Sequence, residues 1–254
     1  MPQPKNLLLE RLPEADRQAL SPHLTAVELK QHDILFDVHG VLDAVHFPTD
    51  GVVSLVLPLS TGEIVETAIV GRDGVVGGAA ALDGRVSLSR GIVQIGGGFL
   101  RCPIEPLKAL LREHPQIRSA LGAHEQALFA QAQQSAACNV THIIEARLCR
   151  WLLRTADLHG TDELPLTQEY LAQMLGVRRT SVTVVARTLQ QAGMIRYSRG
   201  HIKLLDLTAL QQAACECYQT VKSNYEALLH PMNGLRGPAA RSLEDSGSDI
   251  PGRR

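Results

Sequence analysis

The residues whose types and spacing point most directly to chemistry lie in residues 178–190. Arg179, Thr180, Thr183 and Arg187 all fall off the apolar stripe of a predicted helix. Guanidinium and hydroxyl groups donate hydrogen bonds to base edges and to phosphate oxygens. A helical face that offers such donors and carries no carboxylate is suited to contact with a nucleic acid.

The local charge balance points in the same direction. Residues 170–205 contain six cationic side chains and no aspartate or glutamate, although the chain of 254 residues has a formal net charge of −1. Each cation placed on a phosphate releases condensed counterions, so such an excess predicts a polyanionic partner. The six cations are Arg178, Arg179, Arg187, Arg196, Arg199 and Lys203.

Two short helices and a hairpin are expected to position these side chains. The first helix opens at Thr167, whose hydroxyl can cap free backbone N–H groups, and it ends at Gly176. In the second helix Val182, Val185 and Leu189 form the apolar stripe. A basic hairpin follows, so the pattern predicts a helix-turn-helix with a wing. The alternative is a solvated helical hairpin that is basic by chance.

Several positions in this region match a known pattern: Leu171-Ala172, Gly176, Ser181-Val182, the exit Leu189-x-x-x-Gly193-x-Ile195 and the turn Arg199-Gly200. On these residues the region resembles the C-terminal domain of the Crp/Fnr family of bacterial transcription regulators. The resemblance implies a regulator that binds double-stranded DNA as a homodimer on a pseudo-palindromic operator and acts with RNA polymerase. It places the second helix in the major groove.

The resemblance also implies roles for single residues. Arg179 matches a position at which family members contact guanine, and we expect Arg179, Thr180 and Thr183 to read base edges. Thr180 and Val184 stand where the best-known members carry Glu and Arg, so a different half-site is expected. Phosphate contacts are expected from Thr167, Gln168, Arg178, Ser181, Arg187, Arg199, His201 and Lys203.

The N-terminal part of the chain has the pattern of a β-roll. Short β-branched runs from about Val27 to Leu100 are separated by Gly, Asp or Pro, which predicts antiparallel strands. Thr61-Gly62 lies between two apolar runs and predicts a hairpin turn. This block resembles the cyclic-nucleotide-binding-like domain of the same family, which implies a sensor for an effector.

The stretch from Gly71 to Val93 supplies the candidate effector pocket. A cyclic-nucleotide pocket needs a Glu for the ribose and an Arg for the phosphate, but here the acidic residue is replaced around Gly77-Gly78 and the Arg-Ser pair reads Ser89-Arg90. Cyclic AMP is therefore not expected, and the effector stays open. The alternative is that the glycines only turn the roll. The candidate pocket residues are Arg72, Gly77, Gly78, Arg85, Ser89 and Arg90.

Residues 116–138 are expected to form a dimerisation helix. Ile117, Leu121 and His124 begin a series of residues that recur at steps of three and four, which predicts one apolar seam. In the resembling family this helix is the dimer interface. The alternative is that the seam packs against the chain's own β-roll.

The whole chain is thus expected to be an α+β protein with an N-terminal antiparallel β-roll, a long dimerisation helix and a C-terminal winged helix-turn-helix. Its length and its 44% of hydrophobic residues favour two domains. The expected division is a sensor domain at 1–115, the dimerisation helix at 116–138, the DNA-binding domain at 139–230 and a disordered tail at 231–254.

The cysteines do not form a recognisable framework. Five is an odd number, and Cys215-x-Cys217 offers only half of a metal site, because no CxxC motif or histidine pair at zinc-like spacing supplies the other ligands. Buried or idle thiols and no metal are therefore expected. Residues 1–101 contain no cysteine, which argues against the iron–sulfur cluster of one branch of the family. The five are Cys102, Cys138, Cys149, Cys215 and Cys217.

Other classes of protein find little support. No run approaches the ~20 apolar residues of a membrane span, so a cytoplasmic location without a membrane partner is expected. No P-loop, nucleophile elbow, dinucleotide fingerprint or zinc motif is present, so the protein is not expected to be an enzyme. The alternative function is a ligand-binding or protein-interaction module whose winged helix does not read DNA.

Overall fold

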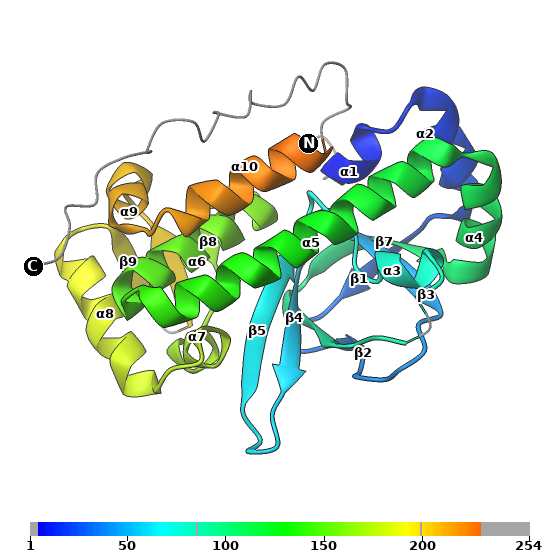
Figure 1. Cartoon of the computed structure of the whole chain (residues 1–254). Helices are drawn as coiled ribbons and strands as arrows, with labels where there is room; N and C mark the ends of the chain where they lie inside the picture. The colour runs from blue at the N-terminus through cyan, green and yellow to red at the C-terminus, as the bar shows by residue number, and fades with distance from the viewer. Residues whose placement is uncertain (1–4, 85, 199, 230–254) are drawn as a thin grey trace, which may run out of the picture.

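The computed structural model describes residues 5–84, 86–198 and 200–229. A long helix, α5 (Pro115–Thr141), lies along an N-terminal β-roll and reaches a C-terminal group of helices with a small sheet (Figure 1). This confirms the predicted α+β class with a β-roll, a long helix and a winged helix-turn-helix. The tail expected to be disordered, residues 231–254, lies outside the described residues.

Two antiparallel sheets form the β-roll, with strand orders β1-β7-β3 and β2-β6-β4-β5. Phe47 and Phe99, each 1% exposed, lie in its interior. The predicted hairpin joins β4 to β5, and Gly62 has a φ of 86°, a conformation that favours glycine. The strands are β1 (Thr25–Leu29), β2 (Ile34–Phe36), β3 (Ala44–Pro48), β4 (Val52–Pro58), β5 (Ile64–Val70), β6 (Arg90–Ile95) and β7 (Gly97–Pro103).

Short helices close the ends of the roll. Asn6 caps the first of them, and its side-chain amide donates hydrogen bonds to the backbone oxygens of Pro48 (2.9 Å) and Gly74 (2.8 Å). These bonds anchor the start of the described chain on the roll. The short helices are α1 (Leu7–Glu10), α2 (Glu14–Leu20), the 3-10 turn η1 (Ser21–His23), α3 (Gly78–Ala81) and α4 (Ile104–Glu113).

Helix α5 begins at Pro115. The first turn of a helix tolerates proline, because a backbone N–H at this position would have no hydrogen-bond partner within the helix. The seam predicted from the sequence does not face solvent. Ile117, Leu121 and His124 are at most 2% exposed, and Ile117 and Leu121 share an apolar cluster with the roll and the last helix. These three residues therefore pack within the chain itself, as the alternative interpretation expected, and dimerisation through α5 stays a prediction. The opposite side of the helix exposes Phe129 (65%) and Val140 (87%).

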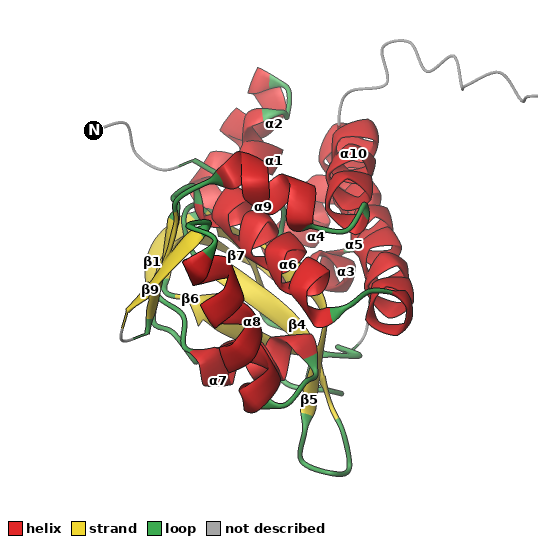
Figure 2. Ribbon diagram, turned by 90° about the vertical axis from the view of Figure 1, so that its left-hand side faces the viewer, coloured by secondary structure: helices red, strands yellow, loops and turns green. Residues whose placement is uncertain are grey.

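The C-terminal elements surround a second core. Strand order β8-β10-β9 forms the wing, and Figure 2 shows α7 and α8 on the side of the molecule that faces the viewer. The elements are α6 (Ile144–His159), β8 (Glu163–Leu164), α7 (Gln168–Leu175), α8 (Arg179–Gln191), β9 (Ile195–Ser198), β10 (His201–Leu204), α9 (Leu207–Ala213) and α10 (Cys217–Leu229).

The second core continues into the β-roll. Val52 and Ile69 of the roll belong to the same buried cluster as Trp151 of α6 and Leu171 of α7. At Gly71 a Cβ atom would lie 2.5 Å from Cβ of Leu158, so only glycine allows this close approach of α6. The C-terminal elements are thus docked on the roll, which the sequence did not predict.

Candidate nucleic-acid interface

Local capping fixes the turn between α7 and α8. The Thr167 hydroxyl accepts a hydrogen bond from the Tyr170 N–H at 3.2 Å, as the sequence predicted for a helix start. Gly176 ends α7 in the left-handed conformation (φ 61°), and its N–H returns to the carbonyl oxygens of the last turn. The chain then enters α8 at Arg179, after Arg178 in extended conformation.

Helix α8 buries one stripe and exposes the other side. Val182, Ala186 and Leu189 are at most 3% exposed and pack on the C-terminal core. The predicted base-reading residues Arg179, Thr180 and Thr183 are exposed, together with Arg187 and Val184. The polar face inferred from the sequence is therefore accessible along the helix.

Hydrogen bonds order part of this face. The Thr183 hydroxyl donates to Oε1 of Gln168 on α7 at 2.7 Å, which joins the two helices at their exposed edge. Nη1 of Arg179 lies 3.6 Å from Oε2 of Glu169, and both side chains are more than 60% exposed. Such an exposed ion pair contributes little to stability, so Arg179 is available to another partner.

The predicted phosphate-contacting residues are spread around the same surface. Thr167, Arg178, Arg187, His201 and Lys203 are exposed, whereas Gln168 and Ser181 are partly buried. Arg199 lies outside the described residues. Nζ of Lys203 donates to Oε1 of Glu163 at 2.6 Å, and this hydrogen bond is the main cause that lowers the pKa of Glu163.

Two carboxylates therefore reach a surface that the sequence predicted to be free of acids. Glu163 and Glu169 come just before the acid-free residues 170–205, and the fold brings them beside Lys203 and Arg179. The prediction missed them because it counted charge along the chain only. The surface remains cationic along α8, where no described residue is acidic.

A cleft separates the start of α8 from the β4–β5 hairpin. Its volume is about 520 Å³. Arg178 and Arg179 line one side of it, and Glu63 of the hairpin lines the other. The hairpin thus stands next to the N-terminal end of α8. The remaining lining residues are Gly62, Ile64, Val65, Glu169, Ala172, Gln173, Gly176 and Val177.

A second pocket, of about 330 Å³, lies between the β-roll and α5. Of the six residues predicted to bind an effector, Gly77 and Ser89 line it. Glu125 and Leu128 of α5 complete its wall, and burial raises the pKa of the Glu125 carboxyl. A carboxylate in this wall would repel a phosphate.

The predicted pocket arginines do not meet there. Arg72 lines a different depression, where its Nε donates to the backbone oxygen of Asp157 at 3.1 Å. Arg90 forms two hydrogen bonds with Asp37, at 3.0 and 2.7 Å. Gly78 faces Glu125, whose Oε1 would lie 2.8 Å from an added Cβ. Arg85 lies outside the described residues, and the candidates Arg72 and Arg90 do not line the pocket between the roll and α5.

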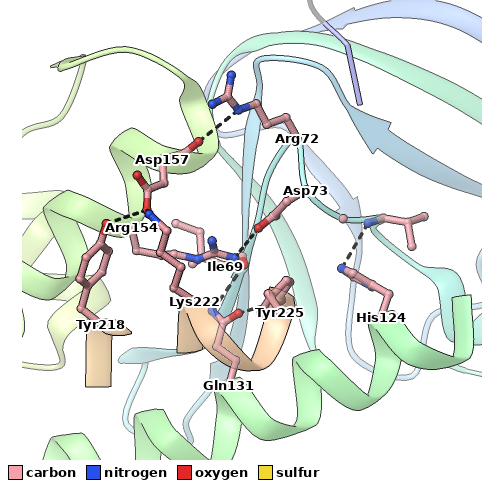
Figure 3. A network of polar contacts seen from close by, with 12 residues as sticks. Ile69, Arg72, Asp73, His124, Gln131, Arg154, Asp157, Tyr218, Lys222 and Tyr225 are labelled. Carbon is pink, nitrogen blue, oxygen red and sulfur yellow. Dashed lines mark hydrogen bonds and ion pairs between the residues drawn. The ribbon is translucent and has the colours of Figure 1, made fainter. Parts of the chain in front are cut away.

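A buried polar network connects the roll to the C-terminal helices (Figure 3). Nη2 of Arg154 on α6 lies 2.8 Å from Oδ2 of Asp73, and the guanidinium also stacks 4.6 Å above the ring of Tyr225 on α10. The Tyr225 hydroxyl donates to Oε1 of Gln131 on α5 at 2.9 Å, and Gln131 donates to the backbone oxygen of Ile69 at 3.4 Å. The network therefore joins α5, α6 and α10 to one edge of the roll.

Glu66 provides a second connection. Its Oε1 accepts a hydrogen bond from Nε1 of Trp151 on α6 at 2.8 Å, and its Oε2 accepts one from Ser54 at 2.5 Å. Burial of the carboxyl raises the pKa of Glu66 to about 7, although both hydrogen bonds act in the opposite direction. Trp151 is 2% exposed, so it lies in the core.

Comparisons with known proteins agree with this architecture. Residues 146–213 match the family model of the Crp-like helix-turn-helix domain. No curated protein matches the sequence. Within the described residues, no helix is both long enough and apolar enough to cross a membrane.

Solved structures share the fold. A transcriptional regulator of the CRP/FNR family from Thermus thermophilus is 24% identical, with a TM-score of 0.60 over 75% of this chain and 98% of that one. FixK2 from Bradyrhizobium japonicum is 14% identical, with a TM-score of 0.65 over 76% of this chain and 98% of that one. The chain therefore carries a Crp-like helix-turn-helix domain and has the fold of the Crp/Fnr transcription regulators, as its C-terminal residues implied.

Proposed function

We propose that this protein is a transcription regulator that reads double-stranded DNA with helix α8. The observation that carries the proposal is the exposed face of α8 with its cationic and hydroxyl side chains. The opposite stripe of the helix, Val182, Ala186 and Leu189, is at most 3% exposed, so burial of this stripe directs the polar face toward solvent. A helix presented in this way fits the major groove, with its N-terminal residues toward the base edges. A regulator of this kind would act in the cytoplasm, without a membrane and without a catalytic site.

The residues divide into two roles. Arg179 would donate two hydrogen bonds to guanine, and Thr180 and Thr183 would read the adjacent positions. The exposed cations and hydroxyls around them would contact phosphates, which sets affinity but not sequence. The phosphate-contacting set is Thr167, Gln168, Arg178, Ser181, Arg187, Arg199, His201 and Lys203.

A homodimer through α5 would deliver two reading helices to a pseudo-palindrome. The side of α5 that the chain leaves uncovered carries Gly122, Phe129 and Val140, and no described atom outside the adjoining helix backbone lies within 4 Å of a Cβ built at Gly122. A small residue beside exposed apolar side chains lets two helices approach closely. Once bound, such a dimer would act on RNA polymerase.

An effector would act through the pocket between the roll and α5. Because α7 packs on β5 and α6 packs on β4, a change in the roll reaches the reading helices directly. The wall supplied by Glu125 favours an uncharged or cationic ligand over a cyclic phosphate. Regulation would follow if the effector binds the docked and DNA-competent arrangements with different affinity.

Selection of bound sites from fragmented genomic DNA tests this function. The expected product is a pseudo-palindromic site, bound more weakly by Arg179→Ala and equally well by Arg112→Ala, which removes an exposed arginine from α4 instead. No measurable affinity for duplex DNA at low salt would contradict the proposal. That result would favour a protein-interaction module, for which the cleft beside the β4–β5 hairpin would be the surface.

A further inference from the structure

Four potential metal ligands meet where α5 ends. Cys138 and His142 lie one turn apart at the C-terminal end of α5, and Cys215 and Cys217 come from the junction of α9 and α10. Their Sγ and ring nitrogen atoms all lie within 4.8 Å of one another. Figure 1 shows the start of α10 next to this end of α5. Cys138, Cys215 and Cys217 are at most 8% exposed and the His142 side chain is 23% exposed, so the three cysteines are shielded from bulk solvent.

The distances fit a single ion. A tetrahedral zinc ion with bonds of about 2.3 Å to sulfur and about 2.0 Å to nitrogen places neighbouring ligand atoms roughly 3.5–3.8 Å apart. Sγ of Cys138 lies 3.6 Å from Sγ of Cys215, and Sγ of Cys217 lies 3.6 Å from Nδ1 of His142. An iron–sulfur cluster contains several metal atoms and needs its ligands further apart than one ion does.

We propose that Cys138, His142, Cys215 and Cys217 bind one thiophilic divalent cation, zinc, in a closed four-coordinate site. Three cysteines and one histidine are a ligand set of structural zinc sites. The sequence prediction of idle thiols without metal found no partner for Cys215-x-Cys217, because the other two ligands lie more than 70 residues earlier. Cys138 and His142 are four residues apart on a helix, and Cys215 and Cys217 are separated by one residue. Only folding brings these two pairs together.

The surroundings orient the ligands. Nε2 of His142 lies 3.1 Å from Oε1 of Glu216, so the carboxylate holds the outer ring nitrogen and leaves Nδ1 directed at the thiols. A carboxylate behind a ligating histidine is the usual arrangement in zinc sites. Nε2 of Gln134 donates to Sγ of Cys217 at 3.0 Å, which stabilises negative charge on that sulfur.

Three sulfur atoms meet here at short range. Sγ of Cys138 lies 3.6 Å from Sγ of Cys215, and all four potential ligand atoms lie within 4.8 Å of one another. A divalent ion bound among them would allow all three sulfurs to be thiolates, because its charge offsets theirs.

The site would join two parts of the molecule. His142 is the C-cap of α5, where the chain turns into α6, and Cys215 and Cys217 flank the turn from α9 into α10. One ion thus ties the end of the long helix to the last helices of the reading domain. Metal binding does not depend on the proposed DNA reading, and its test uses no DNA.

Metal content of the purified full-length protein is the first test. Protein that is purified from zinc-supplemented cells under reducing conditions should contain one zinc ion per chain, as measured by inductively coupled plasma mass spectrometry. Cys138→Ser and Cys215→Ser should lose nearly all of it, whereas Cys149→Ser, which changes a buried thiol outside the cluster, should keep it. Reduced, folded wild-type protein that contains no metal and takes none up would overturn the proposal.

Cobalt substitution is the second test, and because its first measurement uses wild-type protein, it does not depend on the folding of the cysteine variants. Co²⁺ added to chelator-treated wild-type protein should give thiolate charge-transfer bands and the strong visible bands of a tetrahedral ion. Glu216→Gln should keep these bands and weaken Co²⁺ affinity by about 10–100-fold. A weak octahedral spectrum, or an iron–sulfur chromophore with acid-labile sulfide in the purified protein, would overturn a mononuclear site.

Discussion

Glu66 shows how one side chain can report on the contact between the β-roll and the C-terminal helices. Its carboxyl group has a pKa of about 7 because burial outweighs the hydrogen bonds from Ser54 and Trp151. Between pH 4.5 and 7 the folded state keeps a proton that the unfolded state releases. The contribution of the Glu66 carboxyl to the free energy of unfolding is therefore fully present below pH 4.5 and is lost as the pH rises through 7.

Glu66→Gln should remove this part of the pH dependence. The amide stays neutral and can still accept from Trp151, so the variant should gain about 1–3 kcal/mol of stability relative to wild type between pH 5 and pH 8. The difference between the two proteins isolates Glu66 from His46 and His124, whose pKa values burial lowers to about 4. Urea unfolding at several pH values measures it, and a difference that does not change with pH would contradict the assignment.

Arg179 and Lys203 should separate sequence reading from general affinity. Arg179→Ala should lower discrimination at one base position by about 1–3 kcal/mol, because it removes a bidentate contact to guanine. Lys203→Ala should weaken binding to all duplexes alike and reduce the salt slope by about 1, because it removes a phosphate contact. Fluorescence anisotropy with single-base variants of the selected site measures both, and identical profiles for the two variants would refute these roles.

At the scale of elements, α5 illustrates what the sequence could and could not predict. The steps of three and four residues predicted a long helix, and α5 runs over Pro115–Thr141. They could not decide which face would meet a second copy, because this helix carries apolar residues on more than one side. Ile117 and Leu121 face the chain's own core, whereas Phe129 and Val140 are exposed.

A charge on the exposed face of α5 should therefore break the proposed dimer. Phe129→Glu would place a carboxylate where two copies meet, and burying it without a partner is unfavourable. Light scattering coupled to size exclusion should show a dimer for wild type and at least a 10-fold weaker association for Phe129→Glu. Gln116→Glu adds the same charge at an exposed position off this face and should leave the dimer intact. A wild-type monomer would rule out the interface.

The helix-turn-helix was predictable for a different reason. Its turn, cap and apolar stripe lie within residues 166–205, so local physics determines them, and Thr167, Gly176 and Val182 do what the pattern indicated. The carboxylates that pair with Arg179 and Lys203 were missed, because these pairings depend on how separate elements pack. The same limit explains why the predicted effector arginines, Arg72 and Arg90, lie apart.

At the scale of the molecule, the reading domain is docked on the roll through a buried charge pair. The Arg154 and Asp73 side chains are 7% and 16% exposed, and they belong to segments that are 81 residues apart. No local pattern in the sequence indicates which of many charged residues will meet over such a separation. The contact between α6 and the roll therefore follows from the three-dimensional structure and not from the sequence.

Removing Arg154 should destabilise the docked arrangement. Arg154→Ala leaves the Asp73 carboxylate buried without its cation, which should cost about 3–5 kcal/mol in unfolding free energy. Arg101→Ala is the matched control, because Arg101 forms an equally short pair with Asp43 that is exposed and should cost less than about 1 kcal/mol. Denaturant titrations measure both values. Equal losses in the two variants would show that the buried pair does not hold the domains together.

Titration of duplex DNA with wild-type protein at several salt concentrations tests most directly whether two copies of α8 read one DNA site. The expected result is two chains per pseudo-palindromic duplex, with an affinity that falls steeply as salt rises because several phosphate contacts release counterions. A single half-site should bind much more weakly. Saturation at one chain per duplex, or no binding at low salt, would contradict the account.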